Sequence, residues 1–86
     1  PIPIDLRGVN LAGEDLSKLD LSAADLSEAD LIGANLSKAK LFKTNLKKAS
    51  LLNANMEKAE LTGADLTEAV IEACNEKYGM NKGTVS

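Results

Sequence analysis

Residues 24–66 read ADLSE ADLIG ANLSK AKLFK TNLKK ASLLN ANMEK AELTG ADL, a five-residue unit repeated without insertion. A large aliphatic residue stands at every fifth position: Leu26, Leu31, Leu36, Leu41, Leu46, Leu51, Met56, Leu61 and Leu66. A small residue precedes each of these by two positions: Ala24, Ala29, Ala34, Ala39, Thr44, Ala49, Ala54, Ala59 and Ala64. Such a short, fixed period constrains the fold before any secondary structure is assigned.

A period of five excludes both a single α-helix and a flat strand. On a helix each unit advances about 140° past a full turn, so the leucines would surround the axis and leave no apolar face. On a strand, leucines five apart would point to opposite faces. A short extended segment followed by a bend keeps them together, with Ala24 and Leu26 inward, Asp25 outward, and Ser27 and Glu28 at the corner. The sequence therefore predicts an all-β solenoid whose core holds the repeated aliphatic residues.

The pattern A-[D/N]-L-x-x over about residues 4–71 resembles that of the pentapeptide-repeat family. This resemblance implies a right-handed quadrilateral β-helix with four units per coil, and hence about 3.5 coils. Family functions are diverse. Some members mimic B-form DNA and shield type II topoisomerases such as gyrase, often as dimers joined through C-terminal helices. Small members are frequent in cyanobacteria and in thylakoid lumens.

The N-terminal residues 1–23 keep the leucine register but lose the small inward residue. Ile4, Val9, Glu14 and Leu19 stand there instead, which predicts a capping coil, because terminal repeats of solenoids are atypical. A carboxylate in a dry core is costly, so Glu14 is expected in water at the open end.

Residues 67–79 are predicted to form an amphipathic helix that closes the stack after the regular repeats of residues 24–66. Thr67 is the expected N-cap and Gly79 the stop. The helix would bury Val70, Ile71, Cys74 and Tyr78, and it would cover the open last coil. Residues 80–86 are expected to form a solvated tail.

Residues twenty apart should stack on neighbouring rungs about 4.8 Å apart. Two columns alternate in charge, which is stabilising: Asp20, Lys40 and Glu60, and Glu28, Lys48 and Glu68. In two further columns the same kind of residue recurs on each rung. One consists of lysines, Lys18, Lys38 and Lys58, and the other of Asp or Asn, Asp5, Asp25, Asn45 and Asp65. Their simplest interpretation is that lysines extend into water and Asx side chains bind turn backbone. The alternative is an anion site at the lysines and a cation site at the aspartates.

Charge is also banded along the chain, with net −5 in residues 1–30, +5 in residues 31–50 and −4 in residues 51–72. The central basic belt contains Lys38, Lys40, Lys43, Lys47 and Lys48, which are candidate anion contacts. Two apolar residues occupy outward positions twenty apart, Ile32 and Leu52, with Ala12 below them. They form a candidate protein-contact strip. Phe42 is expected on the opposite face and is a further candidate for protein contact.

No constellation for catalysis is present in the sequence. The chain has no histidine, the commonest general base and metal ligand. Its repeat serines stand at corners without a base, and its repeat glycines are corner residues. The single Cys74 excludes an internal disulfide and is interpreted as a small buried hydrophobe. We therefore expect no enzymatic activity, cofactor or metal. With no apolar run near 18 residues, no membrane insertion is expected, and the cellular location stays open.

Three functions remain as hypotheses. The first is a non-enzymatic module that binds an unidentified protein partner, as monomer or dimer. The second, taken from the resemblance, is DNA mimicry at gyrase, which the basic belt and the net charge of −3 disfavour. The third is nucleic-acid or other polyanion binding through the Lys38–Lys48 belt, disfavoured by flanking acids and scarce aromatics.

Overall fold

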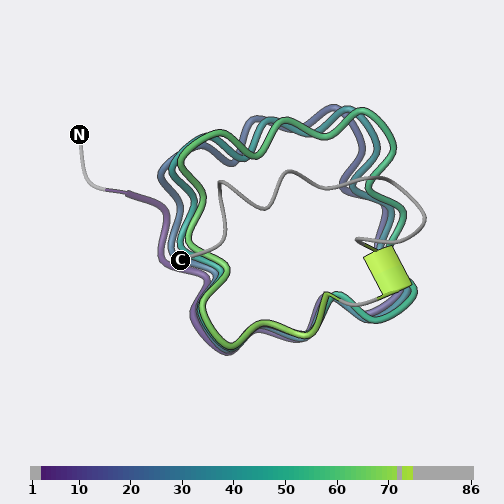
Figure 1. Ribbon diagram of the computed structural model, residues 1–86, viewed down its shortest axis with the longest axis horizontal. Helices are drawn as coiled ribbons and strands as arrows, with labels where there is room; N and C mark the ends of the chain where they lie inside the picture. Colours follow the sequence, from purple (N-terminus) through teal and green to yellow (C-terminus); the bar gives the residue numbers. More distant parts are fainter. Residues whose placement is uncertain (1–2, 72, 75–86) are drawn as a thin grey trace.

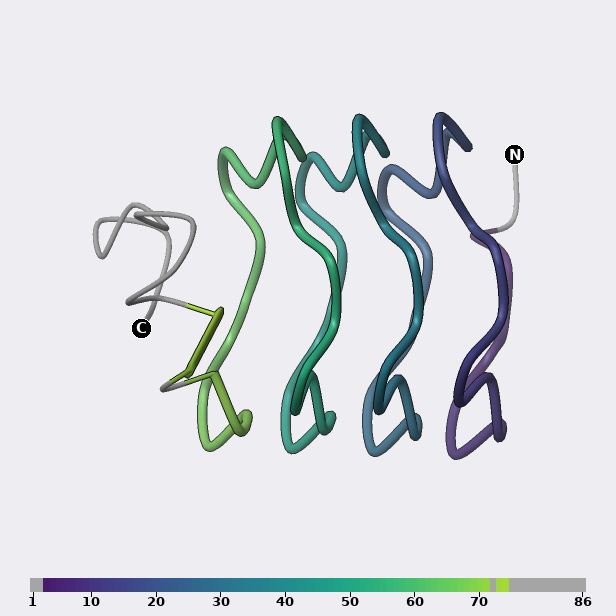
Figure 2. The same cartoon turned by 90° about the vertical axis from the view of Figure 1, so that its right-hand side faces the viewer.

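The computed structural model describes residues 3–71 and 73–74. Parallel bridges join residues twenty apart, beginning with Asp5 to Asp25 and ending with Ser50 to Val70. Their columns start at Asp5, Asn10, Asp15 and Asp20, and we name the four sides of each coil first to fourth in this order (Figure 1). Residues 3–71 make about three and a half such coils, stacked along one axis (Figure 2). The predicted four-sided coil of twenty residues is confirmed, and its right-handed sense stays a prediction.

Each extended segment is a single bridging residue, and every unit ends in a turn. In the unit of Leu36, the Ala39 N–H donates to the Leu36 carbonyl at 3.0 Å. The residue before the small residue has a positive φ, as at Lys38 with φ 59°. A positive φ at the third residue identifies a type II turn. The same conformation recurs in every unit from Gly8 to Glu68, which is why the chain bends regularly every five residues.

Backbone bonds between coils join the same positions throughout. The Leu26 N–H donates to the Asn45 carbonyl at 2.8 Å, and the Asp25 N–H donates to the Ile4 carbonyl at 2.8 Å. The corner residue Glu28 adds a bond to the Lys47 carbonyl at 2.8 Å. Each coil is therefore held by the next through its sides and its corners alike.

The core consists of the repeated aliphatic residues and the small residues between them. Every aliphatic residue predicted for the core, from Leu26 to Leu66, is buried, and Leu46 has no exposed surface. Thr44 is the one polar residue of the buried set, and its Oγ1 donates to the Leu21 carbonyl at 2.8 Å. This bond satisfies the hydroxyl, so Thr44 replaces the usual alanine without leaving a buried polar atom unpaired.

The first coil is open on its outer face among the described residues. Ile4 and Leu19 are 51% and 45% exposed, although they occupy the inward position that alanine fills elsewhere. Val9 is half-buried and Glu14 is exposed. Glu14 therefore lies in water, where a carboxylate carries no desolvation cost.

The predicted start of the C-terminal helix at Thr67 is wrong. Thr67 and Glu68 form a further corner, the Ala69 N–H donates to the Leu66 carbonyl at 3.0 Å, and Val70 bridges to Ser50. Val70 is 44% exposed, so it is not part of a buried helix face. The predicted boundary is wrong because two patterns share several apolar positions here. One is the apolar face of a helix, and the other is the five-residue repeat.

Helical backbone begins only at Ala73–Cys74 among the described residues. Ala73 stands where every earlier unit has a positive φ, and its helical conformation is what ends the corner pattern. Cys74 still occupies the inward register position, twenty residues after Ala54, and is 2% exposed. Its Sγ lies 2.8 Å from the Leu51 carbonyl oxygen. Residues 75–79 of the predicted helix, with Tyr78, and the 80–86 tail lie outside the described residues.

Candidate functional site

The outward Asp and Asn column belongs to the corners and offers no cation site. Each of these side chains accepts a bond from the backbone N–H two residues later, as Asp25 does from Ser27 at 3.0 Å. The same bond is made by Asp5, Asn10, Asp15, Asp20, Asp30, Asn35, Asn45, Asn55 and Asp65. Within residues 3–71 and 73–74 no group of three or more His, Cys, Asp or Glu could hold a metal ion. The turn-capping interpretation of these columns is thus confirmed.

These bonds also stabilise the charged form of several aspartates. Bonds from the Ser27 hydroxyl, at 2.7 Å, and from the Ser27 backbone hold the pKa of Asp25 below its ordinary value of 3.8. The Ser17 hydroxyl and backbone lower the pKa of Asp15 in the same way. A lowered pKa suits a structural carboxylate rather than a general acid or base that must exchange protons near neutral pH.

The basic belt divides into paired and unpaired lysines. Lys47 Nζ lies 3.6 Å from Asp65 Oδ2, and Lys48 Nζ lies 3.9 Å from Glu68 Oε2. Sequence analysis anticipated the column of Lys48 with Glu68 but not the diagonal contact of Lys47. The other candidate anion contacts are exposed and form no ion pair within the part of the chain that the structure describes: Lys18, Lys38, Lys40, Lys43 and Lys58.

The apolar strip lies at the corner that follows the second side. Ile32 is 39% exposed and Leu52 is 43% exposed. The N–H groups of Gly13 and Gly33 donate to their carbonyls at 2.9 and 2.8 Å, which places both residues in one column. Exposed Val70 belongs to the same side, a position that sequence analysis assigned to a helix.

The second side is also nearly free of charge. Its residues, 9–13, 29–33, 49–53 and 69–71, contain no lysine or arginine, and Asp30 is their only acid. We name Ala12, Ile32, Leu52 and Val70 the apolar strip. Phe42, 36% exposed, lies on the fourth side, which faces away from the strip as expected.

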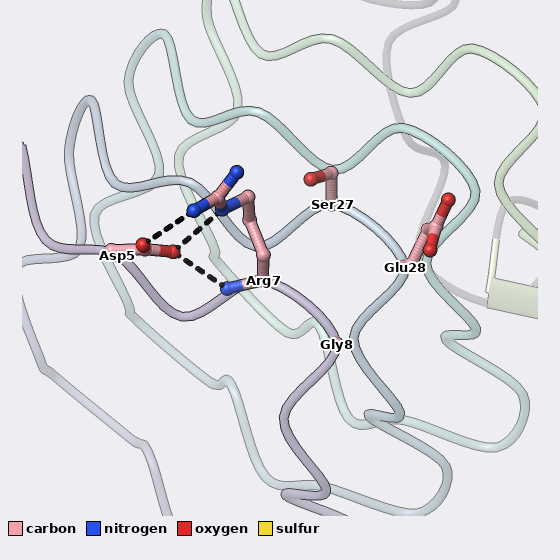
Figure 3. A pocket seen from close by; sticks show the side chains of 5 residues that line it. All are labelled: Asp5, Arg7, Gly8, Ser27 and Glu28. Carbon is pink, nitrogen blue, oxygen red and sulfur yellow. Dashed lines mark hydrogen bonds and ion pairs between the residues drawn. The ribbon is translucent and has the colours of Figure 1, made fainter.

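An open hollow of about 600 Å³ lies where the first two coils meet, lined by Asp5, Arg7, Gly8, Ser27 and Glu28 (Figure 3). Arg7 forms a two-bond pair with Asp5, with Nε to Oδ1 and Nη2 to Oδ2 both at 2.9 Å. Its Nε also lies 4.0 Å from Asp25 Oδ2. Asp5 and Arg7 therefore neutralise each other in this hollow, whereas Glu28 forms no ion pair within the described residues. Sequence analysis missed this cluster, although the Asp-x-Arg spacing within one unit was its signal.

Ser27 and Cys74 are not activated as nucleophiles. The Ser27 hydroxyl donates to Asp25, and the lowered pKa of Asp25 makes this carboxylate a weak base. Burial raises the pKa of the Cys74 thiol, which keeps the sulfur protonated and unreactive.

Four-sided coils of five-residue units around a leucine core define a β-solenoid. The chain belongs to the pentapeptide repeat family: the family model described as pentapeptide repeats (8 copies) matches residues 4–41 and again residues 34–72. No curated protein matches the chain significantly.

Solved structures of family members are similar to the chain. Rfr23 from the cyanobacterium Cyanothece 51142 is 37% identical over 83% of this chain and 55% of its own, with a TM-score of 0.44. A protein of the Arabidopsis thaliana thylakoid lumen is 33% identical over 74% of this chain and 44% of its own, with a TM-score of 0.38. HetL from Nostoc sp. strain PCC 7120, involved in heterocyst differentiation regulation, is 38% identical over 78% of this chain and 38% of its own, with a TM-score of 0.35.

The chain thus spans about half or less of the length of these three relatives. No helix among the described residues is both long enough and apolar enough to cross a membrane.

Proposed function

We propose that this chain is a non-enzymatic interaction module that binds a protein partner through the apolar strip. The observation that carries the proposal is the exposure of Ile32, Leu52 and Val70 on one nearly uncharged side. Exposed apolar residues that form a contiguous surface are typical of contact sites, whereas scattered ones are ordinary. The partner that fits such a surface is a protein with an apolar, weakly charged patch.

The rigidity of the solenoid supports this role. Ile32 and Leu52 belong to corners that are fixed by bonds between coils and by turn bonds, so their backbone is ordered before any partner arrives. A preorganised surface loses little conformational freedom on binding. DNA mimicry receives no comparable support, since a mimic needs an anionic surface, whereas the fourth side of this solenoid and the corner that leads into it carry five lysines.

The test compares affinity capture by the parent chain with capture by the variant Ile32→Lys/Leu52→Lys. The matched control is Ser17→Lys/Ser37→Lys, which adds the same charge at the equivalent positions of the next corner. We expect a protein that the parent and the control retain and the strip variant loses. All three chains should show the same circular dichroism spectrum.

Solution mass distinguishes a second copy of the chain from a different partner. If the parent is a dimer and only the strip variant is monomeric, the partner is the chain itself. Retention of every captured protein by the strip variant would overturn the proposal.

A further inference from the structure

The unpaired lysines gather on the fourth side of the solenoid and at the corner that leads into it. We name residues 38–43, with residues 18–23 and 58–63 on the neighbouring rungs, the lysine side. It carries five exposed lysines, Lys18, Lys38, Lys40, Lys43 and Lys58, and two acids, Asp20 and Glu60. The net charge of this side is +3, in a chain whose net charge is −3. The side therefore attracts anions although the whole molecule does not.

The lysine column at one corner of this side lowers the stability of the fold. Lys18, Lys38 and Lys58 stack on successive rungs, where Lys18 N–H donates to the Ser37 carbonyl and Lys38 N–H to the Glu57 carbonyl. All three have φ between 58° and 64°, a region that costs a residue with a side chain about 1–2 kcal/mol. Like charges on neighbouring rungs repel as well. Residues with side chains adopt the same conformation at other corners, as Ala23 and Glu28 do, so the conformation itself does not select lysine. What distinguishes this corner is the same positive charge on three successive rungs, which indicates a site for an anion.

An aromatic ring lies among these lysines. Phe42 is exposed and stands between Lys40 and Lys43 in the central rung. Its neighbours on the adjacent rungs are Ser22 and Thr62, because Ala23 N–H donates to the Phe42 carbonyl and Lys43 N–H donates to the Thr62 carbonyl. Small polar neighbours above and below leave room beside the ring for a flat ligand.

We propose that the lysine side binds single-stranded nucleic acid, with phosphates at the lysines and one base stacked on Phe42. Cationic surface combined with an aromatic platform is how single strands are bound without sequence preference. A duplex hides the faces of its bases, so the ring contributes only when the bases are free. This surface shares no residue with the apolar strip: its fourth-side residues face away from the strip, and its lysine column lies at the corner that follows that of Ile32 and Leu52.

The structure alters both reasons that disfavoured nucleic acid in the sequence. Two acids of the C-terminal band, Asp65 and Glu68, are engaged by Lys47 and Lys48 at the first side and its corner. The chain has only one phenylalanine, and it lies within the lysine side. Asp20 and Glu60 remain beside Lys40 in its column, so Lys38, Lys43 and Lys58 are expected to make the stronger phosphate contacts.

The test is a fluorescence anisotropy titration of the 86-residue chain against a labelled oligothymidylate of about twelve nucleotides, a typical site size. Repeating it at several salt concentrations gives the number of phosphates neutralised, since each contributes about 0.7 to the slope of log affinity against log salt. The substitution Lys38→Gln/Lys43→Gln is expected to lower this slope by about 1.4. Phe42→Leu should weaken binding about tenfold and leave the slope unchanged.

The matched control is Lys47→Gln/Lys48→Gln, which removes the same charge from the same belt outside the lysine side. We expect the control to retain the parent slope, and the oligonucleotide to bind more tightly than a duplex of equal length. The proposal is overturned if the control and the Lys38→Gln/Lys43→Gln variant lose affinity equally. It is also overturned if the oligonucleotide does not bind at low salt, or if only vesicles with anionic lipids bind.

Discussion

At the corners of the solenoid the backbone conformation is the same whichever side chain is present. Gly8, Ala23 and Lys38 have φ of 67°, 62° and 59°. A turn bond within the unit and bonds to the next coil impose this conformation, so the side chain is free to vary. Corners are therefore where the sequence can change the surface without changing the fold.

Two glycines at corners provide a matched pair for this account. A Cβ at Gly63 would lie 3.0 Å from Lys43 Cγ, whereas at Gly13 nothing lies within 4 Å. Ala23 shows that alanine adopts the conformation. We expect Gly13→Ala to lower the free energy of unfolding by about 1–2 kcal/mol, the cost of a side chain in this backbone region. Gly63→Ala should cost about 1 kcal/mol more, because the neighbour must move.

Urea unfolding measures both glycine substitutions. Adding Lys43→Ala to Gly63→Ala removes the crowding side chain and should restore the value of Gly13→Ala. Equal destabilisation by the two single substitutions would show that crowding at Gly63 is negligible and that φ alone sets the cost.

At the scale of the coil, stability depends on having a neighbour on both faces. Leu46 is fully buried between two coils, whereas Leu6 on the same side is only half-buried in the first coil. In solenoids, stability is approximately the sum of each repeat and its nearest-neighbour interfaces. Interior leucines should therefore contribute more than terminal ones, although the residue and the local backbone are the same.

The pair Leu6→Ala and Leu46→Ala tests this dependence. A fully buried leucine replaced by alanine costs about 2–5 kcal/mol, and the cost falls where the site is partly open. We expect Leu46→Ala to destabilise the chain in this range and Leu6→Ala to cost clearly less, as measured by chemical denaturation. If the terminal substitution cost as much, the first coil would have to be as enclosed as the interior coils.

The C-terminal element was the part of the fold that the sequence predicted least well. The helical arc of Val70, Ile71 and Cys74 also fits a period of five, since Ile71 continues the Leu66 register and Cys74 the register of Ala69. Both patterns place apolar residues at shared positions, so periodicity alone does not separate them. The small residues Ala69 and Cys74, five apart, were the signal that the coil continues.

For the whole molecule, the solenoid, its core and its twenty-residue coil could be predicted from the sequence because they depend on a strict period. The grouping of charge could not. The net charge of a stretch of sequence is a sum over all four sides of a coil. It therefore assigns Lys43 and Lys48 to the same basic belt. The structure places these two lysines on different corners, and it pairs only Lys48 with an acid. Contacts between neighbouring coils, such as Arg7 with Asp25, need the coil geometry as well as the register.

Acid should destabilise the solenoid through its aspartate columns. Asp15, Asp25 and Asp65 have pKa values below 3.8 because they accept hydroxyl and backbone bonds. A lowered pKa in the folded state contributes stability above the unfolded value, and this stability is lost as the pH falls through the folded pKa. We therefore expect the melting temperature to fall as the pH decreases below about 4.

Asparagine separates the titration from the turn bond. Asn35 and Asn45 make the same backbone bond without a titratable group. The variant Asp15→Asn/Asp25→Asn should stay folded at neutral pH and lose less melting temperature than the parent between pH 7 and about pH 3. If the melting temperatures of parent and variant fell equally with pH, these two carboxylates would not cause the loss of stability in acid.

The most direct test of the account is the offset of its backbone hydrogen bonds, which NMR measures as scalar couplings across each bond. A coil of twenty residues predicts a coupling from the Leu26 amide nitrogen to the Asn45 carbonyl carbon, and from the Leu46 amide nitrogen to the Asp65 carbonyl carbon. Each pair is separated by nineteen residues along the chain. Couplings at this constant offset would establish the four-sided coil on which both binding surfaces depend. Couplings of these two amides to carbonyls at any other offset, or to carbonyls four residues earlier as in a helix, would contradict it.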